Sequence, residues 1–185
     1  MLEALSANQR AVELMPEDAE AQNNLGTTLK SLGKLDDAES AFRNAISLNS
    51  SYSAAYSNLG NLLKEQKRTE EAKQIFENLV EAHPNDALFL NNLGSIQLEL
   101  KELENAKTSY QKAIDAQPDY HKAHNNLGIV LYELGQFEKA SVSYEKALVL
   151  NPEYADARYN LGVALHELGR FEEAEISYKK AIEFK

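Results

Sequence analysis

Glycine and proline recur along this chain with one fixed period. Both residue types interrupt regular secondary structure, so their spacing reports the length of the structural unit. The prolines Pro84, Pro118 and Pro152 lie 34 residues apart, and Pro16 lies 68 residues before Pro84. The glycines that share the same period are Gly26, Gly60, Gly94, Gly128 and Gly162. The chain is therefore predicted to be an array of structural repeats without internal domain boundaries.

Each period is predicted to contain two helices. In residues 87–120, apolar and small residues recur at helical spacing in two stripes, and Pro118 ends the second stripe. Acidic residues stand at the start of every second helix, where they interact favourably with the helix dipole. These carboxylates therefore indicate helix starts and not catalytic acids.

A glycine inside each first helix requires a geometric reason, because it costs about 1 kcal/mol relative to alanine. We expect a close approach between the two helices of a pair at this point. The alanines predicted to face the glycines are Ala38, Ala72, Ala106, Ala140 and Ala174. The aromatic residues predicted to pack between neighbouring units are Phe42, Phe76, Tyr110, Tyr144 and Tyr178.

The period and the order Leu-Gly, Ala, aromatic, Ala, Pro resemble the tetratricopeptide repeat. The resemblance implies an all-α fold, a right-handed α-solenoid (superhelix) of stacked antiparallel helix pairs. The predicted organisation is a second helix of a truncated repeat at 1–18, followed by five repeats at 19–52, 53–86, 87–120, 121–154 and 155–185. The departures from the pattern are Lys67 and Lys101 for the turn glycine, Ser50 for proline, Leu79 for alanine and Gln97 for an apolar residue.

The two ends of the sequence lack parts of this pattern. No first helix precedes residues 1–18, and no polar helix follows Phe171, Tyr178 and Ile182 to cover them. Terminal repeats normally carry a solvated outer face. We therefore expect a fragment of a longer array, or a chain that forms homo-oligomers through uncapped ends.

Charge and composition restrict the partners. The net charge is −10, with 19 basic and 29 acidic residues, so nucleic acid and anionic membranes are not expected partners. The absence of cysteine excludes disulfides and thiolate chemistry. No apolar run is long enough to span a membrane and no secretion signal is evident, so we expect a soluble, cytoplasmic protein.

An asparagine precedes every Leu-Gly pair. These residues are Asn24, Asn58, Asn92, Asn126 and Asn160, and Asn61 lies on the same stripe of the second unit. We call the five asparagines before the Leu-Gly pairs the asparagine ladder. A carboxamide both donates and accepts hydrogen bonds, so the ladder and Asn61 are candidates for binding the backbone of an extended peptide. The alternative is that the asparagines only bond a neighbouring helix or water.

Other residues on the first helices refine this hypothesis. The inner face is predicted to be polar in the early units and more apolar in the late ones. Its edge carries Glu65, Glu99, Glu133 and Glu167, which would favour neutral or basic peptides. The Asn-Asn-Leu-Gly segments resemble units of the O-linked N-acetylglucosamine transferase repeat domain, which carries a similar asparagine ladder. The basic residues with which some tetratricopeptide co-chaperones bind a terminal carboxylate are missing here.

Nothing in the sequence predicts catalysis, a metal site or a cofactor. His121 and His124 lie three residues apart without a further ligand, and His124 is predicted to fill a packing position. The favoured function is a protein-protein interaction module, or scaffold, with an extended peptide in its concave groove. Two alternatives stay open: the substrate-recognition arm of a larger enzyme such as a glycosyltransferase, and a self-assembling scaffold.

Overall fold

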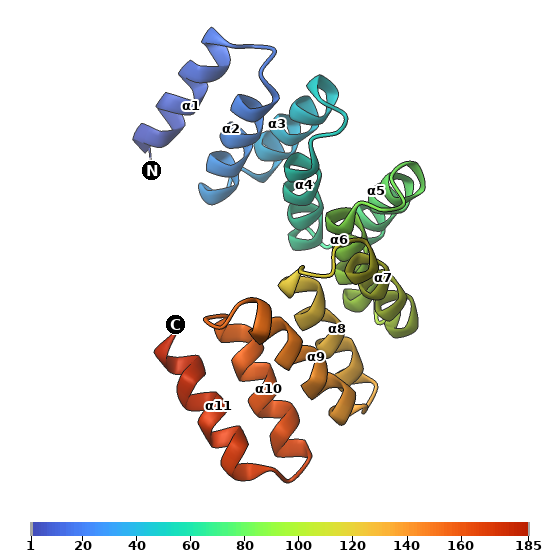
Figure 1. Ribbon diagram of the computed structural model, residues 1–185. Coiled ribbons are helices and arrows are strands. Elements are labelled where there is room, and N and C mark those ends of the chain that lie inside the picture. Colours follow the sequence, from blue (N-terminus) through green and yellow to red (C-terminus); the bar gives the residue numbers. More distant parts are fainter. Residues whose placement is uncertain (1, 185) are drawn as a thin grey trace. The chain divides into compact units, whose positions relative to one another are not determined.

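The computed structural model describes residues 2–184, which form α-helices joined by short turns (Figure 1). The eleven helices of these residues are α1 (Leu2–Leu14), α2 (Ala19–Ser31), α3 (Leu35–Leu48), α4 (Ser53–Glu65), α5 (Thr69–Ala82), α6 (Ala87–Glu99), α7 (Leu103–Ala116), α8 (His121–Glu133), α9 (Phe137–Leu150), α10 (Ala155–Glu167) and α11 (Phe171–Glu183). The prediction of an all-α fold with two helices per period is confirmed.

The helices pack as consecutive pairs. Helices α2 and α3, α6 and α7, α8 and α9, and α10 and α11 form helix pairs, and α4 and α10 each pack on the second helix of the preceding pair. Within the pairs, the turns contain a residue with positive φ, which is 75° at Gly33 but 61° at Lys101. This stacking of helix pairs is the architecture of an α-solenoid.

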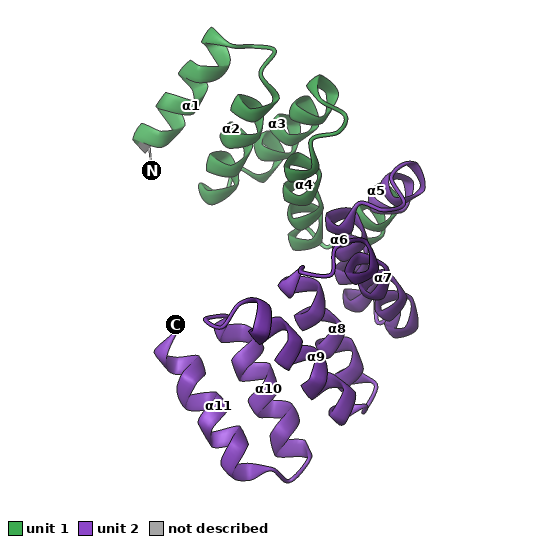
Figure 2. Cartoon of the chain, in the orientation of Figure 1, with its two compact units in different colours: residues 1–75 green, residues 76–185 purple. Residues whose placement is uncertain are grey.

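The contacts divide the chain into two compact units. Unit 1 comprises residues 1–75 and unit 2 comprises residues 76–185 (Figure 2). The border falls inside α5, so it does not coincide with a predicted repeat boundary. The division into a leading helix and five repeats stays a prediction, although each predicted repeat begins at the first residue of a first helix.

The glycines inside the first helices lie against aromatic rings of their own helix pair. A Cβ atom added at Gly26 would lie 2.6 Å from the Phe42 ring, and one added at Gly128 would lie 2.5 Å from the Tyr144 ring. Both rings are almost completely buried. The nearest atoms at these glycines belong to the aromatic rings, which the sequence analysis had not assigned to this contact. The glycine is required because the ring occupies the space of its side chain.

Two polar residues on the first helices serve the packing of unit 2. His124 is buried, and its Nε2 lies 2.9 Å from the carbonyl oxygen of Pro118, which confirms the predicted packing role. Gln97 is also buried and accepts a 2.7 Å hydrogen bond from the Ser109 hydroxyl. Gln97 therefore replaces an apolar residue without leaving its amide oxygen unpaired.

Candidate functional site

The ladder asparagines form hydrogen bonds between neighbouring first helices. The Nδ2 atom of Asn58 donates to Oδ1 of Asn23 over 2.8 Å, which links α4 to α2 in unit 1. In unit 2, Asn126 donates to Asn91 and Asn160 donates to Asn125, each over 3.0 Å. Each of these bonds joins a ladder residue to the residue that precedes the ladder position in the preceding repeat. The three asparagines are therefore part of the contacts between repeats.

In unit 2 these bonds join into one chain of four amides. Asn160 donates to Asn125, Asn125 donates to Asn126 over 3.4 Å, and Asn126 donates to Asn91. The middle contact is long for an N–H···O bond, so the two 3.0 Å bonds fix the orientation of the ladder amides. Since each amide donates in the same direction along the chain, the bonds polarise one another.

The predicted site residues differ in exposure. Asn24 and Asn61 are exposed, whereas Asn58, Asn92, Asn126 and Asn160 are partly buried. Sequence reasoning did not identify the acceptors Asn23, Asn91 and Asn125 as functional residues, and these are the most buried asparagines of the first helices. The doubled Asn-Asn before Leu-Gly was the signal that could have revealed them.

A groove of about 800 Å³ opens beside the amide chain in unit 2. Its volume lies in the range of small-molecule and cofactor sites, about 300–1,000 Å³. Residues from α8, α10 and α11, together with Tyr154 directly before α10, line it: Asn125, Asn126, Ile129, Tyr154, Ala155, Asp156, Tyr159, Asn160, Tyr178, Ala181 and Ile182. The groove thus brings together two of the predicted ladder residues, Asn126 and Asn160, with apolar side chains from three helices.

The apolar part of the groove is formed by exposed aromatic and aliphatic groups. The Tyr159 side chain is 57% exposed, and its ring centroid lies 5.7 Å from that of Tyr178 at an interplanar angle of 49°. Ile182 is 76% exposed, and Ile129 is partly buried. These side chains offer apolar surface to a ligand next to the polar atoms of the asparagines.

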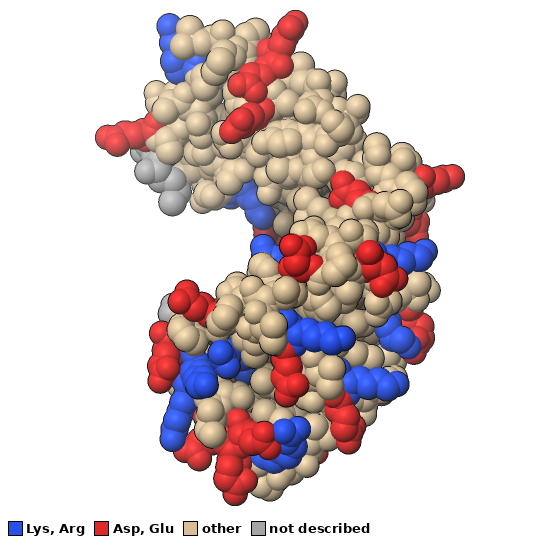
Figure 3. All heavy atoms as spheres, in the orientation of Figure 1, with Lys and Arg blue, Asp and Glu red and all other residues tan. Residues whose placement is uncertain are grey.

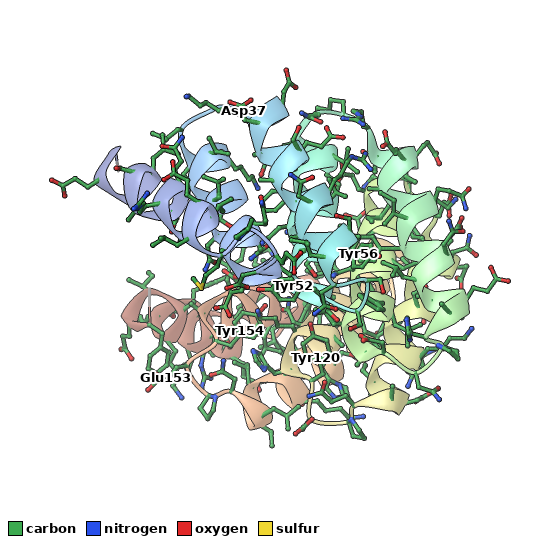
Figure 4. All side chains as sticks on the ribbon, turned by 90° about the horizontal axis from the view of Figure 1, so that it is seen from above. Asp37, Tyr52, Tyr56, Tyr120, Glu153 and Tyr154 are labelled. Atoms are coloured by element: carbon green, nitrogen blue, oxygen red, sulfur yellow. The ribbon has the colours of Figure 1, made fainter. Side chains whose placement is uncertain are left out.

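Tyr154 lies directly before α10 and lines the groove. Figure 4 shows Tyr120 and Tyr154 near one another, whereas Glu153 lies at the edge of the ribbon. Burial, with the nearby Asp156 carboxylate and Tyr120, raises the pKa of Tyr154 above its ordinary value. The hydroxyl therefore stays protonated at neutral pH and can donate a hydrogen bond.

The carboxylates around the first helices are not equally available to a ligand. Glu65 forms a 2.7 Å ion pair with Lys30 in unit 1, and Glu133 forms a 3.2 Å ion pair with Lys101 in unit 2. These pairs offset part of the negative edge that the sequence predicts. Asp156, by contrast, has no ion-pair partner among residues 2–184. The preference for neutral or basic peptides stays a prediction, and Asp156 is the groove residue that favours it.

Metal-binding and membrane-spanning features are absent from the described part of the chain. No group of three or more histidine, aspartate or glutamate side chains there could hold a metal ion. The ring of His121 instead stacks edge-on against Tyr154 at 5.2 Å. None of the helices between residues 2 and 184 is long and apolar enough to cross a membrane.

Comparison with solved structures identifies several repeat proteins with the same fold. The YrrB structure, described as a TPR protein with an unusual peptide-binding site, is 27% identical, with a TM-score of 0.62 over 98% of this chain and 94% of YrrB. TTC0263, a thermophilic TPR protein of Thermus thermophilus, is 26% identical, with a TM-score of 0.77 over 89% of this chain and 90% of TTC0263. MamA is 25% identical, with a TM-score of 0.69 over 86% of this chain and 94% of MamA.

Family models match nearly the whole chain. The TPR repeat model matches residues 94–135 and 130–169. Tetratricopeptide repeat models match residues 2–52, 29–93 and 155–185. The comparison with curated proteins gives no significant match. Repeat period, helix-pair architecture and family models agree, and the chain belongs to the tetratricopeptide repeat family.

Proposed function

We propose that this chain, a protein-protein interaction module, binds an extended peptide segment in the groove of unit 2. The observation that carries the proposal is the amide chain from Asn160 to Asn91 along one side of the groove. Binding, and not catalysis, is the role that we assign to these residues. Within their own units, Asn24, Asn58 and Asn61 of unit 1 and Asn92 of unit 2 are likewise proposed to bind peptide backbone.

The ladder amides keep hydrogen-bonding capacity after pairing with one another. A carboxamide has two N–H groups and an oxygen with two lone pairs. The repeat contact uses one N–H of Asn126 and one of Asn160. A second N–H and lone pairs on the oxygens can therefore bind the N–H and C=O groups of a peptide backbone. Because the pairing holds the amides in place, less side-chain freedom is lost when a peptide binds.

The fold and the comparisons support this proposal. Stacked helix pairs place their first helices side by side, so the same polar position recurs along one surface. The YrrB relative is described as having a peptide-binding site. The groove of this chain also carries exposed apolar side chains beside its amides, which is the usual composition of a binding site.

The test is a peptide array probed with two double variants. Asn126→Ala with Asn160→Ala removes both ladder amides of the groove. Two backbone-directed amides contribute roughly 1–3 kcal/mol, so affinity for bound peptides should fall about 5- to 150-fold. The matched control is Asn44→Ala with Asn105→Ala, which removes two exposed asparagines from second helices. The control should leave peptide affinity unchanged.

A third variant separates peptide binding from repeat packing. Asn91→Ala removes the acceptor of Asn126 without removing a residue that lines the groove. Thermal unfolding of all variants gives the stability cost of each change. If the ladder variant remains folded and binds the array as the wild type does, the asparagines only connect repeats and the proposed function is wrong.

A further inference from the structure

Helix α10 differs from α2, α6 and α8 at the position before its ladder residue. The position before the ladder holds a buried asparagine in α2, α6 and α8, namely Asn23, Asn91 and Asn125. In α10 this position holds Tyr159, whose side chain is 57% exposed. An amide that serves the contact between repeats is thus replaced by an aromatic ring that opens into the groove. This change gives the groove a feature that can distinguish one peptide from another.

A carboxylate lies on the same face of α10. Asp156, Tyr159 and Asn160 are spaced i, i+3 and i+4, so their side chains neighbour one another on the helix surface, and all three line the groove. The Asp156 carboxylate is exposed and has no ion-pair partner among the described residues. A negative charge, an aromatic ring and a backbone-binding amide therefore lie within one turn of helix.

We propose that this face selects peptides that carry a lysine or arginine and a large apolar side chain two positions apart. The cation pairs with Asp156, and the apolar side chain packs on Tyr159 and Tyr178. This inference rests on the proposed function, because the ladder amides bind the backbone of the same peptide. It adds the side-chain specificity of the groove.

The spacing follows from the geometry of the two chains. In an extended peptide, residues i and i+2 point to the same side and lie about 7 Å apart. On a helix, the Cβ atoms of residues i and i+3 lie about 5–6 Å apart. One face of an extended peptide can therefore contact Asp156 and Tyr159 with side chains two positions apart. The net charge of −10 adds a long-range attraction for basic peptides.

The apolar side chain has a defined contact surface. The rings of Tyr159 and Tyr178 are tilted by 49° at 5.7 Å, with Ile129 and Ile182 lining the same groove. A phenylalanine or leucine that packs there covers the exposed surfaces of Tyr159 and Ile182. The cost of their exposure to water is then removed, which favours binding.

The test uses a series of labelled ten-residue peptides made of serine and alanine, with two guest positions. The guest pairs are Lys-x-Phe, Phe-x-Lys, Ser-x-Phe, Lys-x-Ser and Glu-x-Phe, and fluorescence polarisation gives each affinity. Relative to the unsubstituted host, we expect lysine to raise affinity about 2- to 5-fold. We expect phenylalanine to raise it about 2- to 10-fold. Glu-x-Phe should bind more weakly than Ser-x-Phe.

Three single variants identify the residues responsible. Asp156→Asn should abolish the increase in affinity that lysine gives, and Tyr159→Asn should abolish the increase that phenylalanine gives. Asparagine stands at the same repeat position in α2, α6 and α8, so Tyr159→Asn keeps a residue that the fold accepts. The control is Glu153→Gln, which removes a carboxylate three residues before Asp156 but outside the groove lining. It should preserve every preference.

The outcomes distinguish this inference from the proposed function. If the wild type binds all peptides of the series equally, and removal of Asn126 and Asn160 weakens them all, the groove binds backbones but the selectivity is wrong. If the preferences exist but persist in Asp156→Asn and Tyr159→Asn, this face is not their source. If no peptide binds, including Lys-x-Phe, both proposals fail.

Discussion

The two compact units use the same helix-pair architecture with different surface chemistry. In unit 1, Arg68 and Arg43 each contact both Glu39 and Glu71, so four charged side chains form one network across the second helices. In unit 2, Lys107 pairs with Glu104 and Arg170 pairs with Glu173, each over three positions of sequence. On the face in Figure 3, charged atoms of both signs alternate over α8 to α11.

The first helices differ in the same way. In unit 1 they carry the polar pair of Asn58 and Asn23 and an ion pair between Lys30 and Glu65. In unit 2 they carry the four-amide chain and the groove with exposed Tyr159. The repeat therefore fixes the internal packing of each helix pair, whereas the exposed positions differ and form a charged network in one unit and a groove in the other.

The largest expected effects test the packing that the units share. Gly26→Ala in unit 1 and Gly128→Ala in unit 2 each place a methyl group within 2.6 Å of a buried ring. Overpacking of this kind costs roughly 1–3 kcal/mol and exceeds the gain of about 1 kcal/mol in helix propensity. We expect both variants to lower the free energy of unfolding by similar amounts in chemical denaturation.

Thr27→Ala is the control for helix propensity, since Thr27 neighbours Gly26 but is exposed. Hydrogen exchange reports in which unit protection is lost. If only one of the two glycine variants loses stability, the two rings are not equally confined, and the two units do not share this packing.

The sequence predicted the helix pairs because their determinants are local. Glycine, proline and the acidic helix starts act within a few residues, so their spacing determined where α2 to α11 begin and end. The burial of His124 was predictable for the same reason, because its helical register places it in a packing position. The aromatic partners of Gly26 and Gly128 required knowledge of how two helices approach one another, and the sequence analysis did not identify these contacts.

The candidate site was predictable only in part. The recurrence of Asn126 and Asn160 identified the polar position, but the partner of each amide lies on another helix, 35 residues earlier in the chain. Sequence spacing alone does not show which of two adjacent asparagines donates and which accepts. The apolar part of the groove combines Tyr159 of α10 with Ile182 of α11, a combination that depends on the packing of the two helices.

The second largest expected effect is a gain in stability when the lysine in a turn is replaced by glycine. Lys67 in unit 1 and Lys101 in unit 2 have φ of 63° and 61° at the position where other turns have glycine. A left-handed backbone conformation costs a non-glycine residue roughly 1–2 kcal/mol. Substitution by glycine removes this cost, but the larger conformational entropy of glycine in the unfolded state offsets part of the gain in stability. We expect Lys67→Gly to raise the free energy of unfolding by about 1 kcal/mol.

The corresponding substitution in unit 2, Lys101→Gly, should raise the free energy of unfolding by a smaller amount. Lys101→Gly also removes the 3.2 Å ion pair between Lys101 and Glu133, an exposed contact of small value. Gly135→Lys is the reverse control, because it introduces a side chain at a φ of 71° and should destabilise. A loss of stability in Lys67→Gly would show that the turn conformation is not strained by lysine.

The smallest effect tests the charged network of unit 1. Hydrogen bonding to Arg68, opposed by partial burial and reinforced by Arg43, holds the pKa of Glu39 below its ordinary value of 4.5. A carboxylate with a lowered folded-state pKa stabilises the protein above its unfolded-state pKa, and this contribution is lost as the pH falls through the folded-state pKa. Glu39→Gln should therefore cost about 0.5 kcal/mol at pH 7 and reduce the pH dependence of stability below pH 4.5.

Urea unfolding between pH 7 and pH 3 measures this difference, with Glu13→Gln as the matched control in the same unit. Glu13 forms a single pair with Arg10, and both side chains are largely exposed. High salt should weaken the contribution of Glu39, because its partners Arg43 and Arg68 are partly exposed. Equal stability curves for the Glu39 and Glu13 variants at every pH would mean that the four charges act as independent surface pairs, and the network would not distinguish unit 1 from unit 2.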